Sequence, residues 1–335
     1  MKRLLQAFVF VLVLLVLCSC AKEEFETGAT TVYVMDTFAD IELYPQDEVV
    51  TEKITEALYD IEAELSATNG NLFELNENGG GKAGEHTKAL LSLSEKFYEE
   101  TEGAFSPYLG ELIELWGVGS KNYVPTEEEI SEALESALSE NAELSGENLL
   151  LKDGVRLNFG AVAKGYATDV IRKILAEEGV SGAIISVGGN VYVHGLKPSG
   201  ELFDVALRDP DGEANDWVLS LPLYNKFIIS SGDYERNFER DGKVYHHIFS
   251  PETGYPAESD LKTVCVISDD GAMADAYSTA LFVMGKEDAL SFWREHEGFE
   301  LILIDNDKKI TITEGLDGLV SPNGEKDYTY EVEKR

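Results

Sequence analysis

Cysteine is scarce in this sequence, with three residues in 335, and two of the three lie within the first twenty positions. If the chain is cleaved before Cys20, the folded body keeps only Cys265, and one thiol cannot form an internal disulfide. Residues 263–267 (Thr-Val-Cys-Val-Ile) have the alternation of a buried strand. We therefore interpret Cys265 as a small core residue rather than as a nucleophile.

Positive charge is also scarce: Lys and Arg total 27 against 63 Asp and Glu, and the formal net charge is −36. A surface that binds nucleic acid needs the opposite sign, so we expect no nucleic-acid partner. An anionic membrane surface would likewise repel the body of the protein. Hydrophobic residues make up 44% of the chain, which is enough for a core and excludes wholesale disorder.

The apolar run at residues 4–17 is shorter than the roughly 20 residues of a membrane-spanning helix. It follows Lys2 and Arg3 and leads to a small residue before a cysteine, which is the layout of a secretory signal. The sequence Leu-Cys-Ser-Cys at 17–20 resembles a bacterial lipobox, with Cys20 as the lipidated residue.

From this layout we expect a lipoprotein signal peptide at 1–19, a polar tether at 20–30 and one folded domain at 31–335. The expected location is outside the cell, where a lipid anchors the protein to the outer face of the bacterial cell membrane, or to its periplasmic side. An ordinary cleaved signal and an uncleaved anchor are the alternatives.

Hydrophobic periodicity in the body predicts helices and strands in mixed order, without an internal repeat or a clear linker. The segment 69–84 is rich in Asn and Gly and is predicted to be a loop. The pattern indicates one α+β domain with two intimate lobes. Helices are expected at 51–67, 87–100, from about 126, 161–178, 273–284 and 286–296, and strands at 31–44 (a pair around Met35-Asp36-Thr37), 183–187, 191–193, 203–207, 226–230, 262–268, 299–304 and 309–313.

The strongest chemical signal is Asp275 with Thr279, four residues apart on a predicted helix, so that both oxygens share one face. Mg²⁺ prefers oxygen ligands in octahedral array, completed by water and substrate phosphates. One carboxylate and one hydroxyl suit the protein's share of such a site. The alternative is an Asp that caps the start of the helix and a Thr that merely packs.

A second signal is the segment 157–169, in which Gly160 stands at a strand-to-helix junction and Lys164 follows in the first turn. Glycine there lets the backbone approach a ligand, and the free amides and the lysine suit a phosphate. The spacing is not that of a Walker loop. The alternative is a packing glycine with an exposed lysine.

Three further segments carry Gly, Ser or His near expected strand ends. They are Gly188-Gly189-Asn190, Ser230-Ser231-Gly232-Asp233-Tyr234, and the run from Tyr245 to Pro256 that contains His247. Paired glycines at a strand end form a tight turn and can also admit a phosphate. A histidine beside a phosphate site can carry a proton, although a lone histidine is more often structural.

The order of these segments, more than any one of them, resembles the ApbE family of FAD:protein FMN transferases. The match begins with Met35-Asp36-Thr37, continues through Gly103-Ala104-Phe105-Ser106-Pro107, and then takes in the segments above up to Ala280. It spans about residues 32–285. The resemblance implies an ApbE-like (T-fold-like) α+β domain with mixed and antiparallel sheets and flanking helices.

The resemblance also implies a reaction: FAD is split with Mg²⁺, FMN passes to a Thr or Ser hydroxyl of a client protein through a phosphoester, and AMP leaves. His247 and Asp275 would be the catalytic residues. The metal ligands would be Asp275, Thr279 and the carbonyl of Ala161. The residues that the family match assigns to FAD come from several segments: Met35, Thr68, Ala104, Phe105, Ser106, Asn158, Lys164 and Phe249.

The expected partners are FAD and an exported client, for example a redox-pump subunit or a protein with an FMN-binding domain. Three positions depart from the family pattern: Thr68 stands where an aromatic residue is common, and Ser106 and Asn158 stand where Asp is common. The rival readings are an FAD pyrophosphatase giving FMN and AMP, a non-catalytic flavin-binding lipoprotein, and a solute receptor. Thr30, in a Gly-Ala-Thr sequence, is a weaker hypothesis for self-flavinylation.

Overall fold

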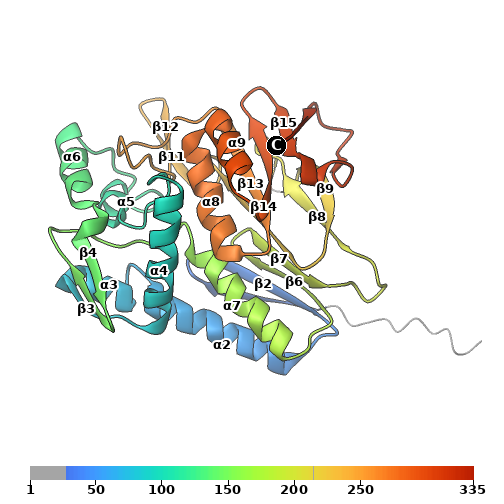
Figure 1. The fold of residues 1–335 in the computed structure, drawn as a ribbon, viewed down its shortest axis with the longest axis horizontal. Helices are drawn as coiled ribbons and strands as arrows, with labels where there is room; N and C mark the ends of the chain where they lie inside the picture. Colours follow the sequence, from blue (N-terminus) through green and yellow to red (C-terminus); the bar gives the residue numbers. More distant parts are fainter. Residues whose placement is uncertain (1–27, 214) are drawn as a thin grey trace, which may run out of the picture.

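The structure is a computed structural model and describes residues 28–213 and 215–335 (Figure 1). The predicted signal peptide, Cys20 and most of the predicted tether lie outside the described residues. Among the residues that are described, no helix combines the length and the apolar character needed to cross a membrane.

A nine-stranded sheet runs through the centre of the molecule. Neighbouring strands are antiparallel except for the last two, which are parallel, so the sheet is mixed and the predicted α+β class is confirmed. The first strand begins at Ala29, two residues before the predicted start of the domain. In spatial order the strands are β1 (Ala29–Val34), β2 (Thr37–Tyr44), β6 (Gly182–Val187), β7 (Asn190–Gly195), β10 (Lys226–Gly232), β13 (Leu261–Ser268), β14 (Phe299–Asp305), β15 (Lys309–Thr313) and β17 (Thr329–Glu333).

Helices cover one face of this sheet and a small second sheet covers the other (Figure 1). Successive side chains of a strand point to opposite faces of the sheet, so each strand contributes to two hydrophobic cores. Ile229 packs against the helices, whereas its neighbour Ile228 and the buried Cys265 face the small sheet. The helices are α2 (Glu48–Leu65), α4 (Glu85–Glu100), α7 (Ala163–Glu177), α8 (Gly271–Met284) and α9 (Lys286–Glu295), and the small sheet holds β8 (Phe203–Arg208), β9 (Trp217–Leu223) and β16 (Ser321–Pro322).

A second lobe lies beside the α4 side of the large sheet (Figure 1). Its own buried cluster gathers around Trp116, whose indole N–H donates to the Gly254 carbonyl at 2.9 Å. This lobe holds α3 (Asn71–Asn78), α5 (Gly110–Trp116), α6 (Glu127–Ser136), a 3₁₀ turn at Ser139–Asn141, a sheet of β3 (Gly80–Lys82), β5 (Asn148–Leu151) and β4 (Ala142–Ser145), and the hairpin of β11 (Asn237–Arg240) with β12 (Lys243–His246). A second 3₁₀ turn, Glu314–Leu316, follows β15 of the large sheet.

The prediction of a loop at 69–84 was wrong, because α3 and β3 lie within it. Leu72 and Leu75 share one helical face and are 0% and 2% exposed, so burial stabilises a short helix that its Asn-rich composition disfavours. The Asn76 side chain also bonds the Leu157 backbone in both directions at 2.9 Å. Gly79, in the left-handed conformation, then ends the helix.

Other local predictions were confirmed where the sequence carried a stop or start signal. The capping box of Thr126 and Glu129 begins α6, with the Glu129 side chain accepting from the Thr126 amide at 2.8 Å. The strands β14 and β15 form the expected antiparallel pair. Gly285 follows α8 as predicted, and Asp270 caps its start by accepting from the Met273 amide.

Candidate active site

The helices α7 and α8 approach each other through two glycines. A Cβ on Gly165 would lie 2.1 Å from the Gly271 carbonyl oxygen, and one on Gly271 would lie 2.6 Å from the Gly165 oxygen. Below this contact, Asp169 on α7 accepts a hydrogen bond from the Ala272 amide at 2.8 Å, which caps the start of α8. Burial raises the pKa of Asp169 to about 6. The two helices are therefore held at a fixed, close spacing.

The close spacing brings Asp275 of α8 against the first turn of α7. Asp275 is 3% exposed, and its Oδ2 accepts from the Gly165 amide at 2.9 Å. Its Oδ1 lies 3.8 Å from Nζ of Lys164, which also donates to the Gly160 carbonyl at 3.4 Å. The two segments that the sequence singled out for metal and phosphate thus form one site.

Thr279 lies one helical turn beyond Asp275 and is half-buried. Its Oγ1 is 3.2 Å from Oγ of Ser231, at the end of β10. Ala161 lies two residues before α7, and the Gly165 amide, four residues after Ala161, donates to Asp275 instead of to the Ala161 carbonyl. Within residues 28–213 and 215–335, no hydrogen bond reaches the Ala161 carbonyl.

These oxygens fit a hard divalent cation. Oδ1 of Asp275 is a buried carboxylate oxygen whose nearest cationic neighbour lies beyond hydrogen-bond distance, and the Ala161 carbonyl has a free lone pair. A carboxylate, a carbonyl and a hydroxyl form the oxygen-only donor set that Mg²⁺ prefers. The set holds a single carboxylate, which agrees with the finding that the described residues contain no group of three or more Asp, Glu, His or Cys able to hold a metal.

Two tight turns border Lys164. Gly188, between β6 and β7, has φ +56°, and a Cβ there would lie 2.8 Å from Oγ1 of Thr37 and 3.2 Å from Cδ of Lys164. Met35 and Asp36 join β1 to β2 with φ values of 55° and 56°. The Met35 amide donates to the Glu62 carboxylate of α2 at 2.8 Å, which holds this turn in place. Met35 therefore lies in a fixed turn two residues before Thr37, and its contact with FAD stays a prediction.

His247 lies close enough to Lys164 to feel its charge and is held by Arg236. The His247 amide and its Nδ1 lie 3.1 and 3.2 Å from the Arg236 carbonyl oxygen, while Nη2 of Arg236 donates to the Asp36 carbonyl at 3.2 Å. Since a carbonyl only accepts, Nδ1 carries the proton and Nε2 is free to accept one. Burial, and then the charge of Lys164, lower the pKa of His247 to about 4, so the ring is neutral at pH 7.

The predicted Ala104-Phe105-Ser106 segment joins the site through Asn158. The Asn158 amide donates to the Pro107 carbonyl and its Oδ1 accepts from the Gly160 amide, both at 2.8 Å. The Phe105 ring is 2% exposed and packs edge-on against Phe97 of α4, so it fixes the segment instead of offering a stacking face. Ala104 and Ser106 on either side are half-buried.

Two predicted FAD contacts are not brought to this centre by any described interaction. Thr68 is exposed, and its hydroxyl lies 3.1 Å from that of Ser66 after the end of α2. Phe249 is 6% exposed, and its ring packs against Trp116 with centroids 5.6 Å apart. Both stay predictions.

The sequence reading missed Arg236, Glu235 and Ser278. Burial raises the pKa of Glu235. The charge of Lys164 opposes this rise in pKa and the charge of Asp275 adds to it, so the Glu235 carboxyl interacts electrostatically with both residues of the site. Glu235 and Arg236 directly follow the Ser-Gly-Asp-Tyr segment, so their position was a usable signal. Ser278, between Thr279 and the buried Tyr277, carried no sequence signal that pointed to the site.

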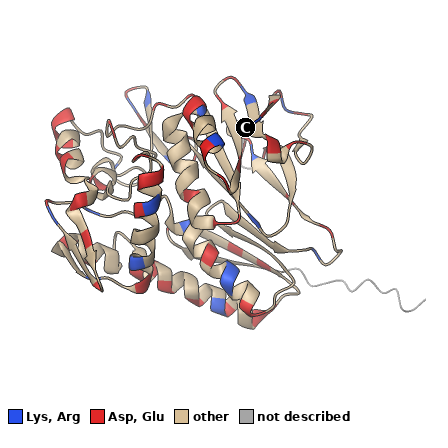
Figure 2. Cartoon of the chain, in the orientation of Figure 1, with Lys and Arg blue, Asp and Glu red and all other residues tan. Residues whose placement is uncertain are grey.

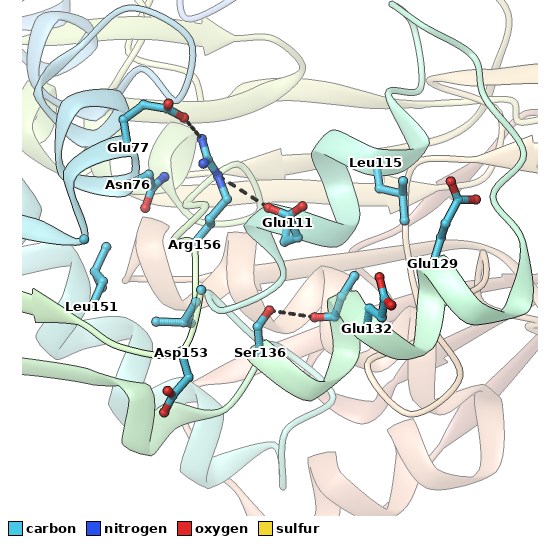
Figure 3. Close-up of a pocket in the computed structure, with 14 residues that line it drawn as sticks. Asn76, Glu77, Glu111, Leu115, Glu129, Glu132, Ser136, Leu151, Asp153 and Arg156 are labelled. Carbon is cyan, nitrogen blue, oxygen red and sulfur yellow. Dashed lines mark hydrogen bonds and ion pairs between the residues drawn. The ribbon is translucent and has the colours of Figure 1, made fainter.

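A hollow of about 580 Å³ in the second lobe is a separate feature (Figure 3). It is lined by carboxylates from α3, α5 and α6, and Arg156 binds Glu77 across it at 2.6 Å. An acidic lining repels a diphosphate, and none of the predicted site residues lines it. Figure 2 shows acidic residues spread over the outer helices and fewer basic residues.

Known proteins are similar to this chain in sequence and in fold. The sequence model of the ApbE family matches residues 35–303. The FAD:protein FMN transferase of Treponema pallidum is 32% identical over 311 residues, covering 84% of this chain and 86% of the relative. That of Klebsiella pneumoniae is 28% identical over 282 residues, covering 82% and 87%.

Solved structures of ApbE proteins have the same fold as this chain. The ApbE protein from Thermotoga maritima superposes with a TM-score of 0.80 at 31% identity, covering 88% of this chain and 99% of that one. The flavinyl transferase ApbE from Pseudomonas stutzeri gives 0.77 at 26% identity, covering 88% and 96%. The family match includes Lys164, His247 and Asp275, and the chain belongs to the ApbE family.

Proposed function

We propose that this protein is a flavin transferase that splits FAD with Mg²⁺, passes FMN to a Thr or Ser hydroxyl of a client protein, and releases AMP. The observation that carries the proposal is the pairing of Asp275 with Lys164 beside the tight turn at Gly188. It supplies free oxygen ligands for a cation and a positive side chain for phosphate at the same place. The named relatives with this activity span the same body of the chain.

In the proposed complex the FAD diphosphate meets Lys164 and the amides at the start of α7, where both charge and helix dipole favour an anion. Mg²⁺ held by Asp275, Thr279 and the Ala161 carbonyl would neutralise charge that builds on the phosphate oxygens. The Met35 turn and the segment at 104–106 border the space for the rest of the dinucleotide. Removal of bulk water from this centre strengthens each of these interactions.

His247 suits the proton step. Its Nδ1–H is bound to the Arg236 carbonyl, so Nε2 can take the proton of the acceptor hydroxyl. The hydroxyl oxygen then attacks the phosphorus of the FMN half, the bond from this phosphorus to the bridging oxygen breaks, and AMP leaves with that oxygen. The low pKa of His247 keeps the ring in the accepting form.

The same centre would also accept water, which would give FMN and AMP without transfer. A pocket that binds FAD without chemistry would not need a free Nε2 or a cation site, so the non-catalytic alternative is disfavoured. The client hydroxyl must reach Nε2 of His247, which favours a Thr or Ser on an extended segment of an exported protein. Transfer and hydrolysis differ only in which hydroxyl reaches this nitrogen.

The test is Asp275→Asn, measured as AMP release from FAD and as FMN attached to exported proteins, with and without MgCl₂. Asparagine keeps an oxygen that can accept from the Gly165 amide but loses the charge, so folding should persist while turnover falls by about 100-fold or more. Asp269→Asn, an exposed acid that pairs with Lys226, is the matched control. Mg²⁺-dependent turnover retained in Asp275→Asn would overturn the metal assignment.

We also propose that Cys20 is lipidated and that the protein acts outside the cell. The support is the basic, apolar and small-residue order of the first twenty positions. Mass spectrometry of the amino-terminal peptide from a membrane fraction tests this. The expected result is a diacylated Cys20, and recovery of an unmodified Cys20 in the soluble fraction would contradict it.

A further inference from the structure

Three hydroxyl groups form a continuous chain between β10 and α8. Oγ of Ser231 lies 3.2 Å from Oγ1 of Thr279 and 2.8 Å from Oγ of Ser278. Oγ of Ser278 in turn donates to the Asp275 carbonyl at 2.9 Å. Ser278 is 0% exposed and Ser231 is 9% exposed, so the two serines are shielded from water.

The direction of each hydrogen bond follows from counting protons, because a hydroxyl has one proton to donate. Ser278 gives its proton to the Asp275 carbonyl, so it can only accept from Ser231. Ser231 has then used its own proton and can only accept from Thr279. The Thr279 proton is therefore directed into the protein, towards β10.

This direction leaves the lone pairs of Thr279 Oγ1 facing away from β10. A hydroxyl ligand binds a cation through a lone pair, and a proton aimed at the cation would oppose binding. Groups that hydrogen-bond to metal ligands, and so fix the orientation of those ligands, affect metal affinity although they do not touch the metal. The sequence reading had singled out Ser231 within its Ser-Gly-Asp-Tyr segment, but the proposed reaction gave it no role.

We propose that Ser231 and Ser278 are positioning residues that orient the Thr279 hydroxyl so that its oxygen lone pairs can bind the divalent cation. The proposal rests on the metal site of the proposed function. It predicts that loss of either serine weakens the cation site without removing a ligand. In Ser278→Ala the Ser231 proton is released from its acceptor and can turn to Thr279, which occupies a lone pair that the cation needs.

The experiment measures Mn²⁺ binding to the full-length protein by the electron paramagnetic resonance signal of free Mn²⁺. Ser231→Ala and Ser278→Ala should each raise the Mn²⁺ dissociation constant by about 10-fold. Ser231→Thr keeps the hydroxyl on a strand that favours threonine, and should restore most of the affinity. Ser230→Ala is the matched control, because Ser230 points to the other face of β10 and has no assigned role.

A serine pair that only packs β10 against α8 would behave differently. Its loss would lower the urea midpoint of unfolding in EDTA, while the folded protein would keep its Mn²⁺ affinity. A dissociation constant within about twofold of the unsubstituted protein in both alanine variants overturns the positioning role. Mn²⁺ binding that Asp275→Asn leaves unchanged would instead overturn the metal site itself, so the two failures are distinguishable.

Discussion

The Asp275 carboxylate accepts the Gly165 amide proton at 2.9 Å and thereby joins α8 to the first turn of α7. Amides in the first turn of a helix have no partner within the helix, so a carboxylate from another helix serves as a cap. The other oxygen of the same carboxylate faces Lys164. One side chain therefore holds two helices together and presents a ligand to the proposed cation.

Gly165→Ala should destabilise the fold by about 3 kcal/mol, at the upper end of what overpacking costs, because its Cβ would lie 2.1 Å from a backbone oxygen of α8. The backbone cannot rotate away as a side chain can, so the helices must separate and the Asp275 bond must lengthen. Urea unfolding in EDTA measures this. Gly324→Ala, where no atom lies within 4 Å of the added Cβ, should leave the midpoint nearly unchanged. Equal midpoints for the two variants would show that the crossing is not tight.

His247 should determine the pH at which the reaction rate falls on the acid side of the pH–rate profile, the acid limb. Its pKa is lowered to about 4, first by burial and then by Lys164, so kcat/KM for FAD should stay high down to about pH 5 and fall near pH 4. A histidine with its ordinary pKa of 6.5 would place this limb near pH 6.5. Lys164→Gln removes the nearby positive charge and should move the limb to higher pH. An acid limb at the same pH in both proteins would contradict the assigned electrostatics.

The same shift has a consequence for stability with a definite sign. Between pH 6.5 and about 4 the unfolded chain binds a proton at His247 that the folded chain does not. The stabilising contribution of the neutral ring is therefore present above pH 6.5 and is lost as the pH falls through this window. The difference in unfolding free energy between the unsubstituted protein and His247→Gln, measured from pH 7 to pH 4, should decrease towards low pH. A difference independent of pH would contradict the low pKa.

Much of the local structure was readable from the sequence, because glycines and caps mark where elements end. The helix α8 was predicted within two residues, and Asp275 and Thr279 share its face as their spacing requires. The helix α3 was missed because its stability comes from burial of Leu72 and Leu75 and from the bonds of Asn76 to Leu157, 81 residues away. Such support depends on the fold and leaves no local pattern.

The site likewise has features that the sequence predicts and features that depend on the fold. Lys164 and Asp275 were found from their own segments, but their contact requires the glycine pair that sets the crossing of α7 and α8. The strand order of the large sheet likewise places β2 beside β6 and β10 beside β13, which hydrophobic alternation cannot specify. Arg236 matters because of a partner 200 positions earlier in the chain, so its role was not accessible from spacing.

Arg236 gives the last prediction. Its guanidinium donates to the Asp36 carbonyl and its own carbonyl binds His247, so one residue connects the proposed proton acceptor to the turn that carries Met35. Arg236→Ala keeps the carbonyl but frees the segment from the turn, so we expect kcat for FMN transfer to fall by about 10-fold, because catalytic rates are sensitive to small misplacements. Arg240→Ala is matched to it, since Arg240 lies in the same hairpin and also donates to a backbone carbonyl, that of Asn122 at 3.0 Å. Both bonds are exposed, so neither loss should change unfolding by more than about 1 kcal/mol. Equal kcat values in the two variants would mean that the connection to Asp36 does not position His247.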